Sequence, residues 1–208
     1  MGTRLKYVAI QPYTIIDNTM YLILGKESYE LNSTRSEKWS SFGGGPNIDI
    51  KCDEIDLGLK EALREFDEES MGIFGPVEEL KKRINSNVYY LNPTGDALTF
   101  FLYIYLQHEY YIDILEVVFN NIYKNLIKCA IKDHLGRLRL LGKCVKQHDI
   151  KTGNSTCIST FCDGFLEKTH IGFFRTDELY LLRENNMFRP EYLLDLPGLI
   201  DKLYKHEI

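Results

Sequence analysis

Two pairs of short apolar segments predict parts of a β-sheet. Residues 7–10 and 20–24 are rich in β-branched, aromatic and other apolar side chains, and the turn-forming dipeptide Asp17-Asn18 lies between them. Residues 87–91 and 97–106 have the same character and flank a second turn-forming segment. Each pair is therefore predicted to form two neighbouring strands.

Helical periodicity appears in two further segments. The segment around residues 59–66 has one apolar face, formed by Leu59, Ala62, Leu63 and Phe66. Residues 110–130 repeat apolar side chains at spacings of three and four, which predicts a second amphipathic helix. The end of the chain is predicted to contain two paired strands, the start of a helix and a short terminal helix, over residues 161–166, 169–174, 175–179 and 199–206.

The helix around residues 59–66 also carries four carboxylates on a second face. At about 100° per residue they fall within one arc of roughly 100°; they are Glu61, Glu65, Glu68 and Glu69. Like charges at this spacing repel one another. Mg²⁺ or Mn²⁺ would offset the repulsion, because these ions prefer oxygen ligands. The alternative is a solvated acidic face, since charged helix faces usually contact water.

Glycines lie on both sides of this acidic helix. Gly43-Gly44-Gly45 precede it and Gly72 follows it. Glycine allows a backbone to approach a metal ion or phosphate closely and at unusual φ, although these glycines alone fit an ordinary turn. Together with Arg64-Glu65-Phe66-Asp67-Glu68-Glu69, they resemble the Nudix box, whose second half reads Arg-Glu-apolar-any-Glu-Glu-any-Gly-apolar. Residues 64–69 match this half without a gap.

The first half of the box departs from the family pattern. Asp56 stands where the family has an isolated glutamate, and ten residues instead of five separate it from Gly45. Met71 adds one residue before Gly72, and Phe42 stands where proline is common. Compared with glutamate, Asp56 keeps the negative charge, but its side chain is one methylene group shorter.

The resemblance implies an α/β fold, in which a mixed sheet lies between helices as an α/β/α sandwich over a single domain of residues 1–208. A Nudix core needs no helix at residues 110–130, so residues 109–156 are interpreted as a helical insertion. By position, the implied metal ligands are Glu65, Glu68, Glu69 and a main-chain carbonyl of the glycine segment, assigned to Gly44. Arg64 is expected to orient Glu68 one turn later.

The implied activity is Mg²⁺- or Mn²⁺-dependent hydrolysis of a pyrophosphate bond in a nucleoside diphosphate linked to another moiety. The family often places its catalytic base in a loop before the last strand, which makes Glu167 the candidate and Glu109 the reserve. The alternative for Glu167 is an exposed loop acid. The candidates for stacking on a nucleotide base are Trp39 and also Tyr103 and Phe174. The alternative for all three is a place in the core.

Composition and charge limit which partners and which cellular location we expect for the protein. A chain of 208 residues with 44% hydrophobic content can bury a full core, and its net charge of −5 gives no global reason to expect DNA or an anionic membrane. No apolar run reaches the roughly 20 residues needed to cross a bilayer, and the first six residues do not resemble a signal peptide. We therefore expect a cytoplasmic or nuclear protein. The five cysteines favour reduced thiols, since a zinc set of Cys144, His148, Cys157 and Cys162 matches no familiar spacing.

One segment carries a strong charge asymmetry. Residues 124–146 contain seven basic side chains and one acid, a net charge of +6 that leaves −11 for the rest of the chain. Arg137, Arg139, Lys143 and Lys146 are the candidates for binding a polyphosphate or an RNA backbone. A solvated surface is the alternative.

Three functions agree with these observations. The first is a hydrolase of a small nucleotide, and the second is a decapping enzyme acting on 5′-capped RNA, which the basic segment and a loose similarity to viral decapping Nudix enzymes favour. The third is a catalytically weak Nudix-fold protein that binds nucleotide or RNA, which Asp56 and the lengthened loop favour.

Overall fold

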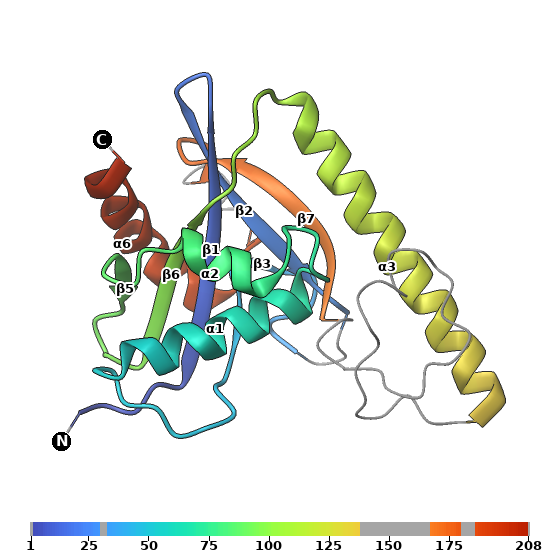
Figure 1. Ribbon diagram of the computed structural model, residues 1–208, viewed down its shortest axis with the longest axis horizontal. Coiled ribbons are helices and arrows are strands. Elements are labelled where there is room, and N and C mark those ends of the chain that lie inside the picture. The colour runs from blue at the N-terminus through green and yellow to red at the C-terminus, as the bar shows by residue number, and fades with distance from the viewer. Residues whose placement is uncertain (1, 30–32, 138–166, 180–185, 208) are drawn as a thin grey trace.

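The computed structural model describes residues 2–29, 33–137, 167–179 and 186–207 (Figure 1). Its strands are β1 Tyr7–Ile16, β2 Thr19–Glu27, β3 Trp39–Ser40, β4 Phe42–Gly44, β5 Tyr89–Leu91, β6 Ala97–Tyr103 and β7 Lys168–Arg175. Its helices are α1 Ile55–Glu69, α2 Val77–Arg83, α3 Tyr110–Arg137 and α6 Pro190–Glu207. The strands form one sheet in the order β3-β2-β1-β6-β5, with β4 paired to β1 and β7 paired to β2. Because β1 and β6 are parallel and the other pairs antiparallel, the predicted mixed sheet is confirmed.

The first hairpin is longer than the sequence predicts. Asp17 and Asn18 have φ values of 49° and 62°, the left-handed conformation that a two-residue hairpin turn requires. Register around this turn pairs Ile16 with Thr19 and Tyr13 with Leu22. The second predicted hairpin is also present, because β5 pairs antiparallel with β6.

Helices cover both faces of the sheet, and the alternation of side chains along the strands assigns each residue to one face. Ile23 joins the core under α1 and α2, while its neighbours Leu22 and Leu24 join the core under α6. In the same way Phe100 faces α1 and Phe101 faces α6. Figure 1 shows α1 and α6 on either side of the sheet. The predicted arrangement of a mixed sheet between helices is therefore present.

Helix α3 lies beside β7, at the side of the sheet away from α6 (Figure 1). It includes the predicted residues 110–130 and continues to Arg137. Phe119, Ile122 and Leu126 are buried in the same core as α1, which anchors the first part of the predicted insertion to the sheet. The four residues of the disfavoured zinc set and the predicted strand at residues 161–166 lie outside the described residues.

The terminal helix is longer than predicted. It begins at Pro190, a position where proline costs no helical hydrogen bond, and Pro197 lies inside it. The prediction that the helix starts only after Pro197 is wrong, because an apolar stripe from Tyr192 through Leu196 to Leu203 packs against the sheet along its length. None of the described helices is long and apolar enough to cross a membrane.

Candidate active site

Helix α1 turns its glutamate stripe inward. Glu61, Glu65 and Glu69 are only 8%, 9% and 2% exposed, and Glu68 is half-buried. Burying carboxylates is costly unless each one has a partner. A fully solvated acidic face, the alternative interpretation of this stripe, is therefore wrong, and the partners of these carboxylates define the site.

Arg64 is the partner of three of them. Its Nε lies 3.2 Å from Glu61 Oε2, its Nη1 lies 3.1 Å from Glu68 Oε2, and its Nη2 donates to Glu65 Oε1. The predicted pairing of Arg64 with Glu68 is present, and two further carboxylates share the same guanidinium. This single cation offsets much of the repulsion within the stripe and fixes the rotamers of the carboxylates that it contacts.

Of the three glycines predicted to form a turn, Gly43 and Gly44 instead belong to strand β4, and Gly45 follows it. Gly43 pairs with Ala9, and a Cβ on Gly43 would overlap the carbonyl oxygen of Val8. A Cβ on Gly44 would lie 2.7 Å from Glu65 Oε2. Neither glycine has a positive φ. These positions therefore require glycine because backbone and carboxylate approach closely, and not because of an unusual backbone conformation.

Glu69 is held by the same strand. The Gly43 N–H donates to Glu69 Oε2 at 2.7 Å, and Lys168 Nζ lies 3.5 Å from Glu69 Oε1. Burial raises the pKa of Glu69 to about 8, although Lys168 and the Gly43 N–H oppose the shift. The carboxyl group that ends the box is thus enclosed, oriented and easily protonated.

Lys168 is a buried cation that sequence reasoning missed. Its side chain is 0% exposed, and its Nζ lies 2.6 Å from Glu27 Oε1 and 2.9 Å from Ser40 Oγ. The aliphatic stem fits over Gly25, where a Cβ would lie 2.8 Å from Lys168 Cδ. The only local signal was its position beside Glu167, since its partners come from distant parts of the chain.

Arg189 completes the same network. Its Nη1 donates to Glu27 Oε1 at 3.0 Å, so Glu27 is shared between Arg189 and Lys168. The guanidinium carbon lies 5.7 Å from the centroid of the Tyr7 ring, within range of a cation–π interaction. No sequence pattern connects these three residues, because Tyr7 begins β1, Glu27 ends β2 and Arg189 directly precedes α6.

Glu167, the predicted base, is near the box. It lines the same cavity as Glu65 and Glu69, is exposed to solvent and forms a side-chain hydrogen bond with Glu69. Partial desolvation raises the pKa of Glu167; Lys168 opposes this effect, while Glu27 and Glu68 add to it. The structure thus brings the predicted base and the predicted metal ligands to one place.

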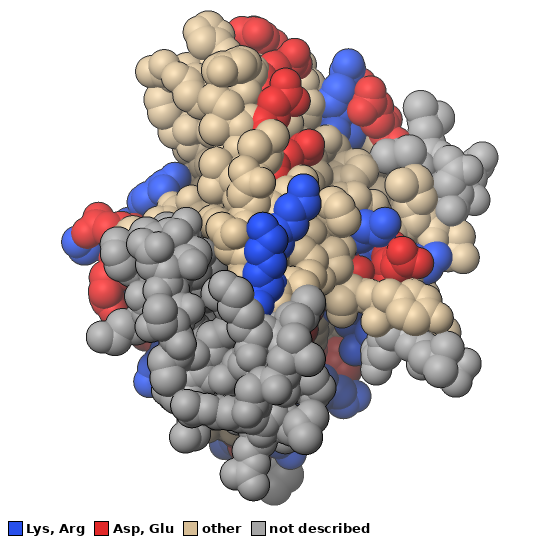
Figure 2. All heavy atoms as spheres, turned by 90° about the vertical axis from the view of Figure 1, so that its right-hand side faces the viewer, with Lys and Arg blue, Asp and Glu red and all other residues tan. Residues whose placement is uncertain are grey.

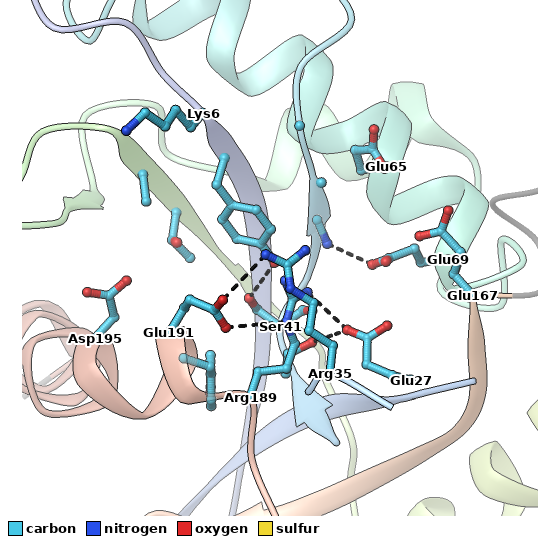
Figure 3. A pocket seen from close by; sticks show the side chains of 18 of the residues that line it. Lys6, Glu27, Arg35, Ser41, Glu65, Glu69, Glu167, Arg189, Glu191 and Asp195 are labelled. Carbon is cyan, nitrogen blue, oxygen red and sulfur yellow. Dashed lines mark hydrogen bonds and ion pairs between the residues drawn. The ribbon is translucent and has the colours of Figure 1, made fainter. Parts of the chain in front are cut away.

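These residues line a cavity of about 980 Å³. Figure 3 shows Glu65, Glu69 and Glu167 on the side of α1, and Arg189, Glu191 and Asp195 on the side of α6. The volume is at the upper end of the range for small-molecule sites. The cavity therefore has an acidic side next to the box and a mixed-charge side with arginines opposite.

The donor atoms are of the kind that a hard divalent cation prefers, although their present arrangement does not form a metal site. Glu65, Glu68 and Glu69 supply the carboxylate oxygens that Mg²⁺ and Mn²⁺ prefer, and the backbone at Gly44 lies against Glu65. In this structure Arg64 and Lys168 contact these carboxylates. Within the described ranges, no three His, Cys, Asp or Glu side chains are grouped to hold a metal ion. Metal binding would therefore require Glu65 and Glu68 to turn away from Arg64.

The remaining predicted aromatic and acidic residues lie elsewhere. Trp39 packs against Phe174 with ring centroids 5.0 Å apart and does not line the large cavity. Tyr103 packs against Tyr13 at 5.5 Å, so all three aromatic candidates belong to the core or its edge. Glu109 accepts a hydrogen bond from the Tyr21 hydroxyl at 2.5 Å and does not line the cavity either.

The basic candidates fall largely beyond the described part of the chain. Arg137 is the last residue of α3, and Arg139, Lys143 and Lys146 lie outside the described residues. On the face that carries α3, acidic side chains gather toward the top and basic ones near the centre (Figure 2). The charge of the described part of this face is therefore mixed, and the phosphate-binding role of the basic segment stays a prediction.

Comparison with known proteins gives distant structural similarities. No protein-family profile and no curated protein matches the sequence. A mutT/nudix family protein from Listeria innocua matches with 14% identity and a TM-score of 0.42 over 96% of this chain and 94% of that one. The NUDIX domain of Shewanella oneidensis NrtR, complexed with ADP ribose, matches with 12% identity and a TM-score of 0.42 over 100% and 91%. A C. elegans Ap4A hydrolase matches with 14% identity and a TM-score of 0.29 over 48% and 64%.

Proposed function

We propose that this protein is a Nudix-type hydrolase that uses Mg²⁺ or Mn²⁺ to cleave a pyrophosphate bond in a nucleoside diphosphate linked to another moiety. The observation that carries the proposal is the fold of residues 64–69. The box sequence forms the end of a helix whose glutamates are buried beside a large cavity, with Glu69 bound to the Gly43 N–H and Glu167 beside it.

Each residue of the site has a distinct task in this proposal. Glu65, Glu68 and Glu69 would hold the divalent ion, which when bound would polarise the pyrophosphate and acidify the attacking water. Arg64 positions Glu65 and Glu68 from one side. Gly43 and Lys168 position Glu69 from the other. Glu167 accepts the proton of the water through its carboxylate, a role suited to a group whose pKa is raised toward neutral pH.

The substrate is proposed to be a small nucleotide or 5′-capped RNA. The cavity admits a nucleotide, and its exposed rim includes Tyr29 and Arg35. Decapping specifically is supported by the basic segment and by the loose similarity of the box to those of viral decapping enzymes. The test is product analysis of the purified protein with Mg²⁺ or Mn²⁺ against a nucleotide panel and capped RNA. If the protein hydrolyses neither substrate class with either metal, the proposal is contradicted.

A catalytically weak nucleotide-binding protein is the second candidate. The ion pairs that Arg64 forms with Glu61, Glu65 and Glu68 favour it, because they compete with metal binding. Calorimetric titrations with Mn²⁺ and with nucleotide separate the two functions. A hydrolase binds Mn²⁺ through its box and loses that binding in Glu68→Gln and Glu69→Gln. The weak binder instead binds nucleotide equally well with and without metal.

A further inference from the structure

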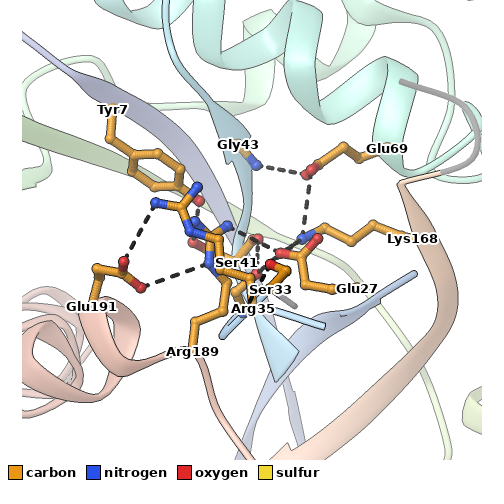
Figure 4. Close-up of polar contacts among 11 residues, drawn as sticks. Tyr7, Glu27, Ser33, Arg35, Ser41, Gly43, Glu69, Lys168, Arg189 and Glu191 are labelled. Carbon is orange, nitrogen blue, oxygen red and sulfur yellow. Dashed lines mark hydrogen bonds and ion pairs between the residues drawn. The ribbon is translucent and has the colours of Figure 1, made fainter. Parts of the chain in front are cut away.

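The cavity wall opposite the box carries two arginines. Arg189 directly precedes α6, and its backbone N–H donates to the Trp39 carbonyl at 3.0 Å, which fixes its position relative to β3. Arg35 belongs to the loop between β2 and β3 and lines the same cavity. Figure 4 shows both guanidinium groups close to Glu191, which belongs to the first turn of α6.

Arg189 is rigid and desolvated. The residue is 8% exposed, its Nη1 donates to Glu27 Oε1 at 3.0 Å, and its guanidinium lies over the Tyr7 ring. Glu27 also contacts Lys168 through the same oxygen atom. Because Arg189 shares Glu27 with Lys168, which is also paired with Glu69, Glu27 neutralises Arg189 only in part, and Arg189 keeps part of its capacity to attract an anion in the cavity.

Glu191 lies between the two arginines. Arg35 Nη2 is 3.4 Å from Glu191 Oε1, and Arg189 Nε is 4.0 Å from Glu191 Oε2. Both contacts are long for a charge-assisted hydrogen bond, and the pair with Arg35 is exposed, so neither contributes much stability. The carboxylate of Glu191 thus occupies the place of an anion, held loosely enough to be exchanged.

We propose that Arg35 and Arg189 form a phosphate subsite of the cavity, in which Glu191 is the internal anion that the substrate displaces. The ligand class is a nucleotide pyrophosphate or polyphosphate, because planar guanidinium groups match phosphate oxygens as paired donors. This inference rests on the proposed function in one respect: the phosphate bound here is the neighbour of the one that faces the box.

The connection between the two walls supports this placement. Arg189 and Lys168 share Glu27, and Lys168 contacts Glu69, so a continuous chain of ion pairs runs from the arginine wall to the end of the box. The Gly43–Gly45 segment also lines this cavity. A pyrophosphate with one phosphate at the box therefore has its second phosphate directed along this chain toward Arg189.

The subsite predicts effects of opposite sign for two exposed residues. Arg35→Gln removes a donor and is expected to weaken the binding of inorganic pyrophosphate about tenfold, the scale of one hydrogen bond between charged groups. Glu191→Gln removes the competing anion and is expected to strengthen binding by roughly two- to fivefold. Arg175→Gln is the matched control, because Arg175 is also a partly exposed arginine paired with an acid, Asp177, but does not line the cavity.

The measurement is isothermal titration of the full-length protein with pyrophosphate in the presence of EDTA, which is independent of hydrolysis. Unchanged affinity in Arg35→Gln, or weaker binding in Glu191→Gln, would overturn the subsite. Both variants alter exposed side chains, so neither outcome depends on a folding defect. If the two variants change pyrophosphate affinity in the expected directions but the wild-type protein hydrolyses nothing on the panel, the subsite stands and the hydrolase proposal fails. If the protein hydrolyses nucleotides while both variants bind as wild type does, the subsite alone fails.

Discussion

The ammonium group of Lys168 lies 3.5 Å from the carboxyl group of Glu69, and neither side chain is appreciably exposed. The two residues come from different sides of the site: Glu69 ends α1, and Lys168 begins β7. Their contact joins the box to the edge of the sheet. A lysine at this depth needs counter-charges, and Glu69 and Glu27 supply them.

Replacing Lys168 by methionine should destabilise the fold. The change leaves Glu27 and Glu69 without the cation between them, and removal of one member of a buried ion pair costs about 3–5 kcal/mol. The free energy of unfolding measured in urea reports the loss. Lys205→Met is the control, because Lys205 forms an exposed pair with Asp201 at 2.6 Å and should lose less than about 1 kcal/mol. Equal effects of the two substitutions would contradict the role of Lys168.

Two adjacent glycines should respond differently to alanine. A Cβ on Gly44 would lie 2.7 Å from Glu65 Oε2, whereas the nearest atom to a Cβ on Gly45 is 3.6 Å away. Gly44→Ala should therefore displace Glu65 and lower Mn²⁺ affinity and hydrolysis at least about tenfold, while Gly45→Ala should have little effect. Calorimetric Mn²⁺ titration and initial rates check both variants. Similar losses in both would show that the requirement for glycine at 44 has another cause.

The stability of the metal-free protein should fall as pH rises from 4.5 to about 8. The pKa of Glu69 is raised from 4.5 to about 8 in the folded state. In this window the folded protein binds a proton that the unfolded chain has released, so the free energy of unfolding decreases with pH. The raised pKa values of Glu65 and Glu167 act in the same direction.

Urea unfolding in EDTA, measured from about pH 5 to about pH 8, tests this dependence. Glu69→Gln should flatten the curve, because the amide does not titrate. Glu109→Gln is the control, since Glu109 lies near Tyr21 and outside the cavity. A slope that remains unchanged in Glu69→Gln would assign the titration to another group.

Glu167→Gln should lower kcat by roughly 10²- to 10⁴-fold with little change in KM or metal affinity, the usual effect of removing a positioned base. Glu109→Gln should retain the wild-type rate because of its place beside Tyr21. Small effects of both substitutions would indicate that a glutamate of the box is the base.

Neutralising Arg137, Arg139, Lys143 and Lys146 together should weaken binding of long RNA and spare hydrolysis of a small nucleotide. If these side chains neutralise phosphates, the slope of log affinity against log salt should become shallower by roughly 0.7 for each single-strand phosphate that the variant no longer neutralises. Binding assays over a range of salt concentrations measure the slope. An unchanged slope would leave the segment as a solvated surface.

The sequence by itself determined the local features of this protein. The Asp17-Asn18 turn, the apolar face of α1 and the Arg64–Glu68 pair all follow from interactions between residues close in the chain, where periodicity and turn chemistry act. The α/β class and the box glutamates could therefore be predicted. The second half of the terminal helix could be predicted as well, but its start at Pro190 could not, because packing along the whole apolar stripe outweighed the proline inside it.

Tertiary structure alone decided which distant residues complete the site. Lys168 and Glu27 are 141 residues apart in sequence, and Arg189 and Glu27 are 162 apart, yet each pair forms an ion pair. Only the pairing of β2 with β7 and the packing of α6 on the sheet bring them together. The burial of Glu69 was equally beyond the sequence, because a helix fixes which face a glutamate occupies but the strand packed against that face determines whether water reaches it.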